Sequence, residues 1–339
     1  MQRLDPSDTS GILPIAYFHA LARLGGEGLI LIEPETPFVS LGVFDDAATT
    51  VDLDYCRAHG LPVMRRQTGG GMVLLGPRQV FYTLVVKRPH RPIPARVNDA
   101  YGHLSQAPIS VYRELGIETR LRPINDIVTL AGRKIAGQGA GDINGRFCFV
   151  GSILLDFDVD LMHRIVKLPS EALRAPLKAA ITDHLTSVAR ETGAHPDVSF
   201  VKDCLAKAFA PLVGGLEPGA VSPQLTALAR TLSRELCRDA LSSDDTEAGT
   251  LFKVREGLYL CQRAFAGRDG EIVVSLTIDE GRIASVNLSG HGLTHEPPDL
   301  ERLIGRPFQR TTLLAELPDF GPLGIAREPL IDGLLATRG

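Results

Sequence analysis

The segment 65–76, RRQTGGGMVLLG, constrains the structure of this chain more than any other stretch. Three consecutive glycines, Gly69–Gly71, can adopt backbone dihedrals that other residues disfavour, and they let a ligand approach the main chain closely. Their amide groups can point at a phosphate or a carboxylate. Arg65 and Arg66 add fixed positive charge before the glycines, and an apolar, strand-like stretch follows. The segment therefore indicates either a hairpin turn with two surface arginines or an anion-binding loop.

A second glycine-rich segment, NDIVTLAGRKIAGQGAG, occupies residues 125–141. A strand-like stretch leads to a turn, and Lys134 lies on the returning strand between glycines. A lysine in this position can reach into a cleft, where its charge can bind a carboxylate and an α-phosphate together. Asn125 and Asp126 offer the oxygen ligands that Mg²⁺ prefers. The alternative is a surface hairpin on which Arg133 and Lys134 are simply solvated.

Strand-like and helix-like patterns alternate along the first 240 residues. Helical patterns occur at 12–24, 99–115, 173–191 and 222–238, and strand patterns at 28–32, 38–44, 63–66, 80–86 and 147–157. Because strands and helices are mixed throughout, we expect an α/β or α+β domain rather than a sandwich or a bundle.

The last 90 residues form a separate pattern. The polar run 241–249, LSSDDTEAG, is typical of a linker. Apolar residues then alternate over 272–278 and again over 284–288, with a turn at 279–281, which predicts a β-hairpin before a helix start at 298–304. We therefore predict two domains, residues 1–240 and a small α+β domain at 250–339. His291 and His295 lie among glycines and prolines and read as loop residues rather than as a metal site.

The overall composition is ordinary for a globular protein. The 339 residues carry a net charge of −4, which gives no general electrostatic reason to bind nucleic acid. No run of about 18 apolar residues indicates a transmembrane helix, and the start of the chain lacks the apolar core of a secretory signal. The five cysteines are scattered without CxxC pairing and indicate reduced thiols. We expect a cytoplasmic protein with neither nucleic-acid nor membrane partners, and a monomer by default.

The two glycine-rich segments, in this order, resemble the lipoate–protein ligase family. RRQTGGG is similar to that family's Arg-Arg-x-[Ser/Thr]-Gly-Gly-Gly motif, and NDIVTLAGRKIAG to its Asn-Asp…Gly-x-Lys-[Val/Ile]-[Ser/Ala]-Gly motif. The run 151–161, GSILLDFDVDL, resembles the strand and turn that follow them in the family, and 253–317 its small C-terminal domain. The resemblance spans nearly the whole chain. It implies a mixed-sheet catalytic domain with flanking helices, shared with biotin ligases, and a small α+β C-terminal domain.

The resemblance also implies a reaction. An enzyme of this family activates lipoate or octanoate with ATP and Mg²⁺ to an acyl-adenylate, and passes the acyl group to a lysine of a lipoyl domain or lipoyl carrier protein. Carried over by position, Lys134 would contact the acyl carbonyl and the α-phosphate. The substrate and nucleotide pocket would comprise Arg66, Thr68, Gly69, Gly70, Gly71, Met72, Val73, Leu74, Gly137, Gln138 and Gly139.

The chain departs from the family pattern at several positions. Leu75 and Val150 stand where the family usually has histidines, and Gln138 and Gly139 replace the usual Ser-Ala. The two missing histidines remove two polar groups from the pocket. We therefore predict a more apolar pocket and a divergent member of the family.

Related octanoyltransferases share the fold but need a cysteine nucleophile, which forms a thioester before transfer. One family places it just upstream of the Asn-Asp strand, where ETRLRPIND has none. Another places it in a Pro-Cys-Gly turn, where Leu168, Pro169 and Ser170 stand. Cys148 lies within an apolar run and reads as a small buried side chain. The missing cysteines favour ATP-dependent ligation over transfer from acyl carrier protein or another lipoyl protein. A non-catalytic lipoyl-binding module is the alternative from another class.

Overall fold

The computed structural model describes the chain except residues 91, 169–170, 242–249, 256, 294–297 and 337–339, and it describes the backbone alone for 172, 241, 250–255 and 336. The chain divides into two compact units. The first comprises Met1–Ala48, Asp52–Ile165 and Ile181–Ser243, and the second Thr49–Val51, Val166–Ala180 and Asp244–Gly339. Two short stretches from the first 240 residues thus join the second unit. The assignment of catalytic and accessory roles to 1–240 and 250–339 stays a prediction.

The first unit is built around an eight-stranded mixed sheet with the order β11-β1-β2-β6-β10-β9-β8-β7. Its strands are β1 (Gln2–Leu4), β2 (Gly28–Ile32), β6 (Gln79–Lys87), β7 (Thr119–Arg122), β8 (Asp126–Thr129), β9 (Lys134–Ile143), β10 (Arg146–Leu154) and β11 (Glu217–Pro218). β1 runs parallel to β11 and to β2, and the neighbours from β2 to β7 are antiparallel. The mixed sheet confirms the predicted fold class.

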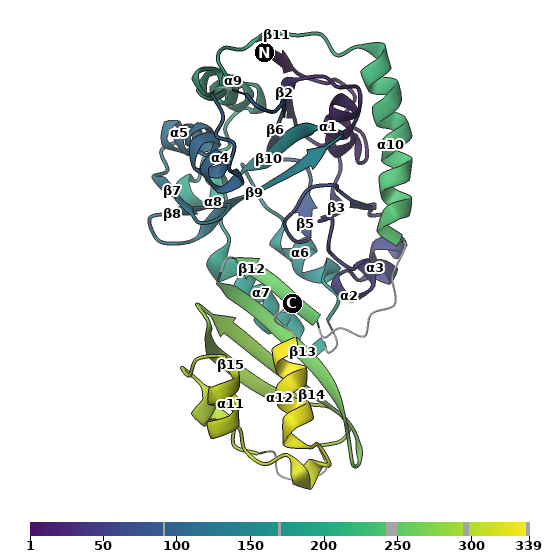
Figure 1. Cartoon of the computed structure of the whole chain (residues 1–339), viewed down its shortest axis with the longest axis vertical. Helices are drawn as coiled ribbons and strands as arrows, with labels where there is room; N and C mark the ends of the chain where they lie inside the picture. The colour runs from purple at the N-terminus through teal and green to yellow at the C-terminus, as the bar shows by residue number, and fades with distance from the viewer. Residues whose placement is uncertain (91, 169–170, 242–249, 256, 294–297, 337–339) are drawn as a thin grey trace. The chain divides into compact units, whose positions relative to one another are not determined.

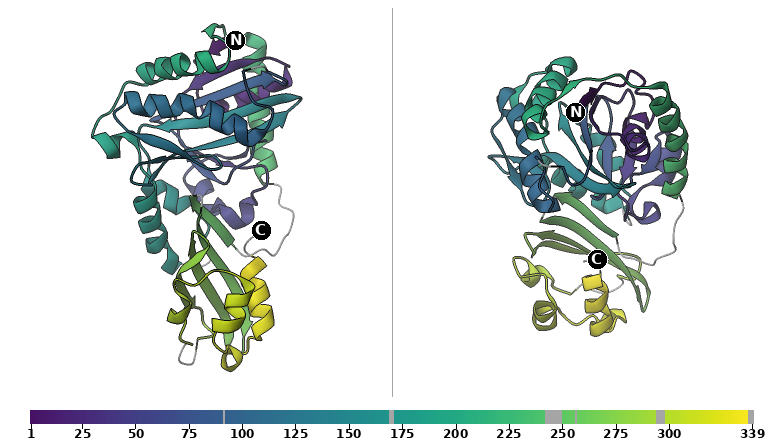
Figure 2. Two further views of the ribbon diagram at one scale, coloured as in Figure 1. Left: turned by 60° about the vertical axis from the view of Figure 1, so that its left-hand side comes forward. Right: turned by 45° about the horizontal axis from the view of Figure 1, so that its top comes forward.

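Helices cover both faces of this sheet, as Figures 1 and 2 show. One face carries α4 (Val97–Leu104), α5 (Gln106–Glu114) and α9 (Val198–Phe209), and the other carries α1 (Leu13–Arg23) and α10 (Pro223–Leu241). The strand β2 explains why both faces need covering. Leu29 and Leu31 face one hydrophobic core and Ile30 and Ile32 the other, since successive side chains of a strand alternate between faces.

A small three-stranded sheet completes the first unit, with the order β4-β3-β5. Its strands are β3 (Phe38–Leu41), β4 (Val63–Arg65) and β5 (Val73–Leu75), and the short helices α3 (Leu53–Ala58) and α6 (Val159–Ile165) lie against each other nearby. β3 pairs parallel with β4 and antiparallel with β5. The segment 66–72, which we call the glycine loop, connects the two outer strands.

Two predicted helices are each divided in the structure. The pattern 99–115 forms α4 and α5, separated at Ser105, because Pro108 cannot donate an amide to the carbonyl of Leu104. The pattern 173–191 forms α7 (Arg174–His184) and α8 (Val188–Thr192). Here Ser187 starts the second helix as an N-cap, its side chain accepting the amide of Arg190. Among the described residues, no helix is both long and apolar enough to span a membrane.

The second unit contains an antiparallel sheet in chain order: β12 (Thr250–Arg255), β13 (Leu258–Gly267), β14 (Gly270–Asp279) and β15 (Arg282–Ser289). The helices α11 (Arg310–Glu316) and α12 (Arg327–Ala336) share its hydrophobic core. Ile272, Val274, Leu276 and Ile278 are buried as the alternation predicts. The return strand differs, because the register shifts at Thr277/Ile278 and the shift buries Ile283 instead of Ala284. Of the predicted linker 241–249, Leu241 is the last residue of α10 (Pro223–Leu241), and 242–249 lie outside the described residues, as does His295.

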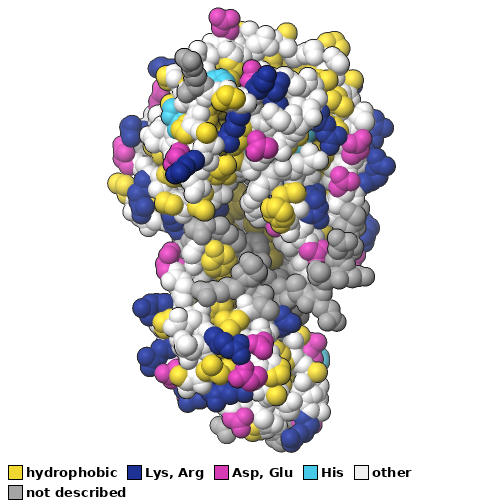
Figure 3. All heavy atoms as spheres, viewed as in Figure 1, with side chains coloured by type: hydrophobic (Ala, Val, Ile, Leu, Met, Phe, Trp, Pro, Cys, Tyr) yellow, Lys and Arg dark blue, Asp and Glu magenta, His cyan; other side chains and the backbone are white. Residues whose placement is uncertain are grey.

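Short helical segments complete the chain: α2 (Ala47–Thr50), η1 (Glu171–Leu173), η2 (Ala210–Leu212), η3 (Glu301–Leu303) and η4 (Gly321–Leu323). The predicted helix start at 298–304 is therefore a single 3-10 turn. On the face of the first unit seen in Figure 3, basic and acidic side chains are interspersed.

Candidate functional site

The glycine loop lies directly on strand β9, so the two glycine-rich segments of the sequence meet in space. The amide of Gly69 donates to the carbonyl of Ala140 over 3.2 Å. A Cβ at Gly139 would lie 3.0 Å from the Gly69 carbonyl oxygen, and one at Gly141 would lie 3.1 Å from that of Gln67. Both glycines point to the same face, since alternate residues of a strand share a face. The absence of side chains at these positions lets the loop approach the strand.

Arg66 fixes the glycine loop from inside. Its side chain is 6% exposed, and its guanidinium donates to the carbonyl oxygens of Ser40 at 2.9 Å, Gly69 at 3.1 Å and Gly71 at 2.8 Å. Burial lowers the pKa of Arg66 to about 10, so it stays protonated at neutral pH. The predicted pocket residue therefore acts on the loop conformation. Gly70 takes a φ of +94°, which residues with a side chain rarely adopt.

A buried histidine holds the start of the loop. The amide of Gln67 donates to Nε2 of His19 at 3.0 Å, and the other ring nitrogen of His19 lies 2.9 Å from the carbonyl of Ile15. This pattern requires a neutral ring with the proton on Nδ1. Burial is the main cause that lowers the pKa of His19 to about 4, and the charges of Arg23 and Arg66 act in the same direction.

The turn that follows β3 braces the other side of the loop. The amide of Val43 donates to the carbonyl of Thr68, and a Cβ at Gly42 would overlap the carbonyl oxygen of Gly70. Asp45 closes the turn by accepting the amide of Gly42 at 2.8 Å, and the guanidinium of Arg65 donates to the carbonyls of Gly42 and Asp45. Arg65 is thus committed to backbone carbonyls as Arg66 is.

Lys134 begins β9 and forms an ion pair with Asp126 at the start of β8. The distance from Nζ to Oδ1 is 2.8 Å, and the carboxylate side chain is only 1% exposed against 19% for the lysine. The carbonyl of Lys134 accepts the amide of Thr186, which fixes its backbone. A Cβ at Gly137 would lie 3.3 Å from Nζ of Lys134, so this glycine leaves room for the ammonium group.

The Lys134 ammonium and the glycine loop lie against neighbouring positions of one strand face. Gly137 borders the ammonium and Gly139 borders the Gly69 carbonyl. Two residues along a strand span about 7 Å. The structure therefore brings together the charged lysine and the loop that the sequence singled out.

Gln138 points to the opposite face and is fully engaged. Its Oε1 accepts from the Ser105 hydroxyl at 2.8 Å, and its Nε2 donates to the Tyr82 hydroxyl at 3.0 Å. Its amide donates to the carbonyl of Asn125, whose side chain donates back to the carbonyl of Gln138 at 2.6 Å. A Cβ at Gly151 would overlap the Tyr82 hydroxyl. The predicted pocket residue Gln138 therefore holds the sheet to the α4–α5 junction.

Several polar groups of the loop have no internal partner. Thr68 is 1% exposed, and its hydroxyl makes no hydrogen bond within the described part of the chain. The amides of Gly70 and Gly71 likewise have no acceptor among the described residues. A Cβ at Gly71 would meet nothing within 4 Å. Gly70 and Gly71 are exposed, so their amides are available to a ligand that reaches the loop, whereas the Thr68 hydroxyl is buried.

Three residues predicted to belong to the substrate and nucleotide pocket lie at β5, the edge strand paired with β3: Met72 precedes the strand, and Val73 and Leu74 belong to it. The Met72 and Leu74 side chains are buried. Leu75 and Val150, which replace the usual histidines, are both partly buried against the core between the sheet and α1 and α10. Leu75 and Val150 therefore extend an apolar core, and this surrounding accommodates apolar side chains at both positions.

Both predicted magnesium ligands make other contacts in this structure. The Asp126 carboxylate is the counter-ion of Lys134, and the Asn125 amide group donates to a backbone carbonyl. Within the described ranges, no three His, Cys, Asp or Glu side chains are close enough to hold a metal ion. The assignment of Mg²⁺ to these two residues stays a prediction.

All five cysteines lie among the described residues, and four of them are buried. Cys148 is 0% exposed, and burial raises the pKa of its thiol to about 12. The prediction that Cys148 is a buried side chain is confirmed. Cys237 is half-buried on α10, and burial raises the pKa of its thiol as well. A thiolate nucleophile at neutral pH is therefore disfavoured at these two cysteines.

Sequence reasoning missed His19, Tyr82 and Ser105, which position the loop and the strand. A lone histidine within the apolar helix 12–24 was the one available indication, since a buried imidazole needs hydrogen-bond partners. Nothing in the local sequence of Tyr82 or Ser105 indicates that they meet Gln138, because they lie 56 and 33 positions before it in the chain.

Comparison with known proteins identifies the family. The family model of the lipoyl protein ligase A/B catalytic domain matches residues 16–210, more than half of the chain. The chain belongs to this family. The matched range contains the glycine loop, Lys134 and Asp126.

Curated relatives of this lipoyl protein ligase A/B family member are octanoyltransferases. The chain is 28% identical over 232 residues to octanoyltransferase LipM of Kyrpidia tusciae, covering 62% of this chain and 83% of the relative. It is 28% identical over 259 residues to octanoyltransferase LipM of Symbiobacterium thermophilum, covering 68% and 92%.

Solved structures share the fold. A bipartite lipoate protein ligase from Thermoplasma acidophilum matches with a TM-score of 0.62 at 22% identity, covering 72% of this chain and 99% of that one. Lipoate-protein ligase A bound with ATP matches with a TM-score of 0.58 at 21% identity, covering 71% and 99%. These similarities confirm the lipoate-ligase-like mixed sheet, and the chain is a divergent member of the family.

Proposed function

We propose that this chain transfers an octanoyl or lipoyl group to a lysine of a lipoyl carrier protein. The donor is acyl carrier protein, which carries the group as a thioester, or another lipoyl protein, which carries it as a lysine amide. The names of the relatives support this choice, since both LipM proteins are octanoyltransferases. The bipartite ligase of Thermoplasma acidophilum belongs to a lipoylation system with its own E2 lipoyl domain, which supports a lipoyl domain as acceptor. The sequence alone favoured ATP-dependent ligation because the expected cysteines are missing, and the relatives now favour transfer instead.

The observation that carries the proposal is the Lys134–Asp126 pair beside the glycine loop. A buried carboxylate holds the ammonium group, and Gly137 leaves space beside it. The position of the ammonium group is therefore fixed before a ligand binds. The unpaired amides of Gly70 and Gly71 add hydrogen-bond donors on the loop. Fixed donors and a fixed positive charge favour an acyl group whose carbonyl oxygen becomes negative during the reaction.

The reaction balances without an enzyme cysteine. The acceptor lysine, as a free amine, attacks the thioester carbon and forms the new C–N bond while the carbonyl oxygen takes the negative charge. Collapse of this intermediate breaks the C–S bond, the thiolate leaves, and it takes up the proton that the amine releases. Lys134 lowers the energy of the oxyanion, and one such donor is worth about 10²–10³ in rate. Asp126 holds the Lys134 side chain in place through their ion pair.

ATP-dependent ligation is the second candidate, and the burial of the cysteines favours it. Cys148 is completely buried, and none of the other four cysteines lies in the glycine loop or the Lys134 hairpin. Octanoyltransferases that pass the acyl group through a cysteine would need such a thiol. In a ligase, Lys134 and the loop amides would instead face the carbonyl and phosphate oxygens of an acyl-adenylate.

Two reactions analysed by intact-mass spectrometry of a lipoyl domain separate these candidates. The first supplies octanoyl–acyl carrier protein without ATP, and the second supplies octanoate with ATP and Mg²⁺. Octanoylation of the lipoyl domain in the first reaction supports the transferase, and octanoylation in the second alone supports the ligase. If neither reaction modifies any lipoyl carrier, a non-catalytic lipoyl-binding module replaces both.

Single substitutions test whether acylation of the lipoyl domain depends on Lys134. Lys134→Ala should reduce the rate at least 100-fold, whereas Lys87→Ala, an exposed lysine at the end of β6, should leave it unchanged. Cys148→Ser should retain activity, because the proposed transfer uses no enzyme thiol. A complete loss of activity in a folded Cys148→Ser protein would show that a covalent thioester step was overlooked.

A further inference from the structure

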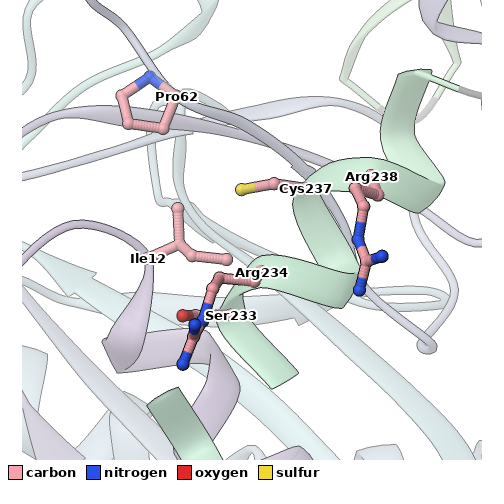
Figure 4. A pocket seen from close by; sticks show the side chains of 6 residues that line it. All are labelled: Ile12, Pro62, Ser233, Arg234, Cys237 and Arg238. Atoms are coloured by element: carbon pink, nitrogen blue, oxygen red, sulfur yellow. The ribbon is translucent and has the colours of Figure 1, made fainter. Parts of the chain in front are cut away.

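A hollow lies in the first unit, and none of the lining residues that the structure describes belongs to the candidate site. Its volume is about 690 Å³, and its lining residues come from α10, from the residue before α1 and from the segment before β4: Ile12, Pro62, Ser233, Arg234, Cys237 and Arg238. Figure 4 shows the Cys237 thiol pointing from α10 towards the space next to Ile12 and Pro62. The volume falls within the roughly 300–1,000 Å³ of small-molecule pockets.

The charge of this hollow is positive. Among the lining residues that the structure describes, the charged ones are Arg234 and Arg238, which leave α10 one turn apart. Within the described part of the chain, neither guanidinium pairs with a carboxylate, and Arg234 uses only its Nε, which donates to the carbonyl of Arg230. The nearby Glu235 is paired with Arg23. Two guanidinium groups that leave successive turns of α10, neither paired with a carboxylate among the described residues, favour an anionic ligand.

The remaining lining is mostly apolar. Ile12 is 5% exposed and belongs to the core under α1 and α10, and Pro62 and the Cys237 thiol complete this side. Such a surface takes up an alkyl chain, since burial of each methylene contributes about 0.8 kcal/mol. Positive charge and apolar surface in one hollow are the two features that a site for an amphiphilic anion needs.

An adjoining hollow of about 460 Å³ shares Ile12, Ser233 and Arg234 with the first. It also contains Asp8, whose carboxylate pairs with Arg230 at 2.7 Å. This carboxylate disfavours an anionic group in the adjoining hollow. The anionic head therefore belongs at Arg234 and Arg238 rather than at Arg230.

We propose that the hollow along α10 binds a small anion with a short alkyl chain, its carboxylate or phosphate head on Arg234 and Arg238 and its chain against Ile12, Pro62 and Cys237. This site is distinct from the acyl-transfer site and does not depend on the proposed function. The shared chemistry of an alkyl carboxylate and an alkyl phosphate defines the ligand.

Cys237 provides a direct measurement, because it is the one cysteine of the five that is not buried. Its rate of alkylation by iodoacetamide is followed by mass spectrometry of the intact protein, at alkaline pH since burial raises the pKa of this thiol. Octanoate and octyl phosphate should each slow alkylation at least fivefold in a saturable manner. Octanol and inorganic phosphate, which each lack one half of the ligand, should slow it less than twofold.

Three variants locate the effect. Arg234→Gln/Arg238→Gln should weaken protection by octanoate or octyl phosphate at least tenfold, with the fold checked by circular dichroism and thermal unfolding. Arg57→Gln, which removes one exposed arginine of α3, should leave protection unchanged. Lys134→Ala should also retain it, because the candidate acyl-transfer site is separate.

Several results would overturn the proposal. Equal protection by octanol would reveal an apolar groove without anion selectivity. Unchanged protection in the double arginine variant would remove the role of the guanidinium groups. Loss of protection in Lys134→Ala would mean that octanoate acts through the acyl-transfer site. If only octyl phosphate protects Cys237, the ligand class narrows to phosphate monoesters, and if only octanoate does, it narrows to carboxylates.

Discussion

The ammonium group of Lys134 lies 2.8 Å from Oδ1 of Asp126, a carboxylate whose side chain is 1% exposed. Lys134 starts β9 and Asp126 starts β8, and the antiparallel hairpin places them beside each other although seven residues separate them. The lysine is therefore held by the fold before any substrate arrives. Its role in the fold and its proposed role in the reaction have to be measured separately.

Lys134→Met should lower the free energy of unfolding by about 3 kcal/mol, because it leaves the buried Asp126 carboxylate without its ammonium partner. Urea denaturation measures this change. Lys134→Met/Asp126→Asn should recover most of the stability, since no unpaired charge remains, yet acyl transfer should stay lost. Activity close to wild type in either protein would remove Lys134 from the reaction.

Gly139→Ala should destabilise the protein by about 1–3 kcal/mol, because the new Cβ would meet the Gly69 carbonyl at 3.0 Å and Val150 at 3.2 Å. Gly102→Ala is the matched control. It lies inside α4 with nothing within 4 Å of a new Cβ, so it should stabilise by about 0.5–1 kcal/mol. Thermal unfolding of both variants tests the close approach of loop and strand, and equal shifts would contradict it.

Gln138→Leu should lower the free energy of unfolding by about 2–3 kcal/mol, because the buried hydroxyls of Ser105 and Tyr82 each lose a hydrogen-bond partner. Gln106→Leu, at an exposed position one helix turn from Gly102, should change stability by less than about 0.5 kcal/mol. Chemical denaturation compares the two. Similar stabilities for both variants would show that the Gln138 network contributes little.

His19 should make stability fall as the pH falls. Its pKa is about 4 in the folded protein and 6.5 without the fold, so between these values the unfolded chain binds more protons. The neutral ring therefore contributes about 3 kcal/mol to the free energy of unfolding above pH 6.5. This contribution is lost as the pH drops from 6.5 towards 4.

The urea midpoint of His19→Gln should accordingly depend less on pH between 4 and 6.5 than that of the wild type. His59→Gln, which changes an exposed histidine, should follow the wild-type curve. Parallel curves for His19→Gln and wild type would show that His19 is not buried in its neutral form.

The order of the two glycine-rich segments was enough to predict the family and the mixed sheet. The hairpin around Lys134 and the burial of Cys148 were also readable, since apolar alternation and apolar runs are local properties. The role of Arg66 was not readable. Its sequence context indicates an anion-binding arginine, whereas the structure commits its guanidinium to the carbonyls of Ser40, Gly69 and Gly71. Only the path of the loop decides which acceptors surround it.

The sequence by itself determined that the GGG segment needs unusual backbone freedom and that a lysine lies between glycines on a hairpin. The tertiary structure decided that the glycines of β9 serve to admit the loop, and that Gln138 turns away from the loop to meet Ser105 and Tyr82. The reason is physical. Backbone preference and hydrophobic period act between near neighbours in sequence, whereas hydrogen-bond partners and the pairing of buried charge depend on segments that only folding brings together.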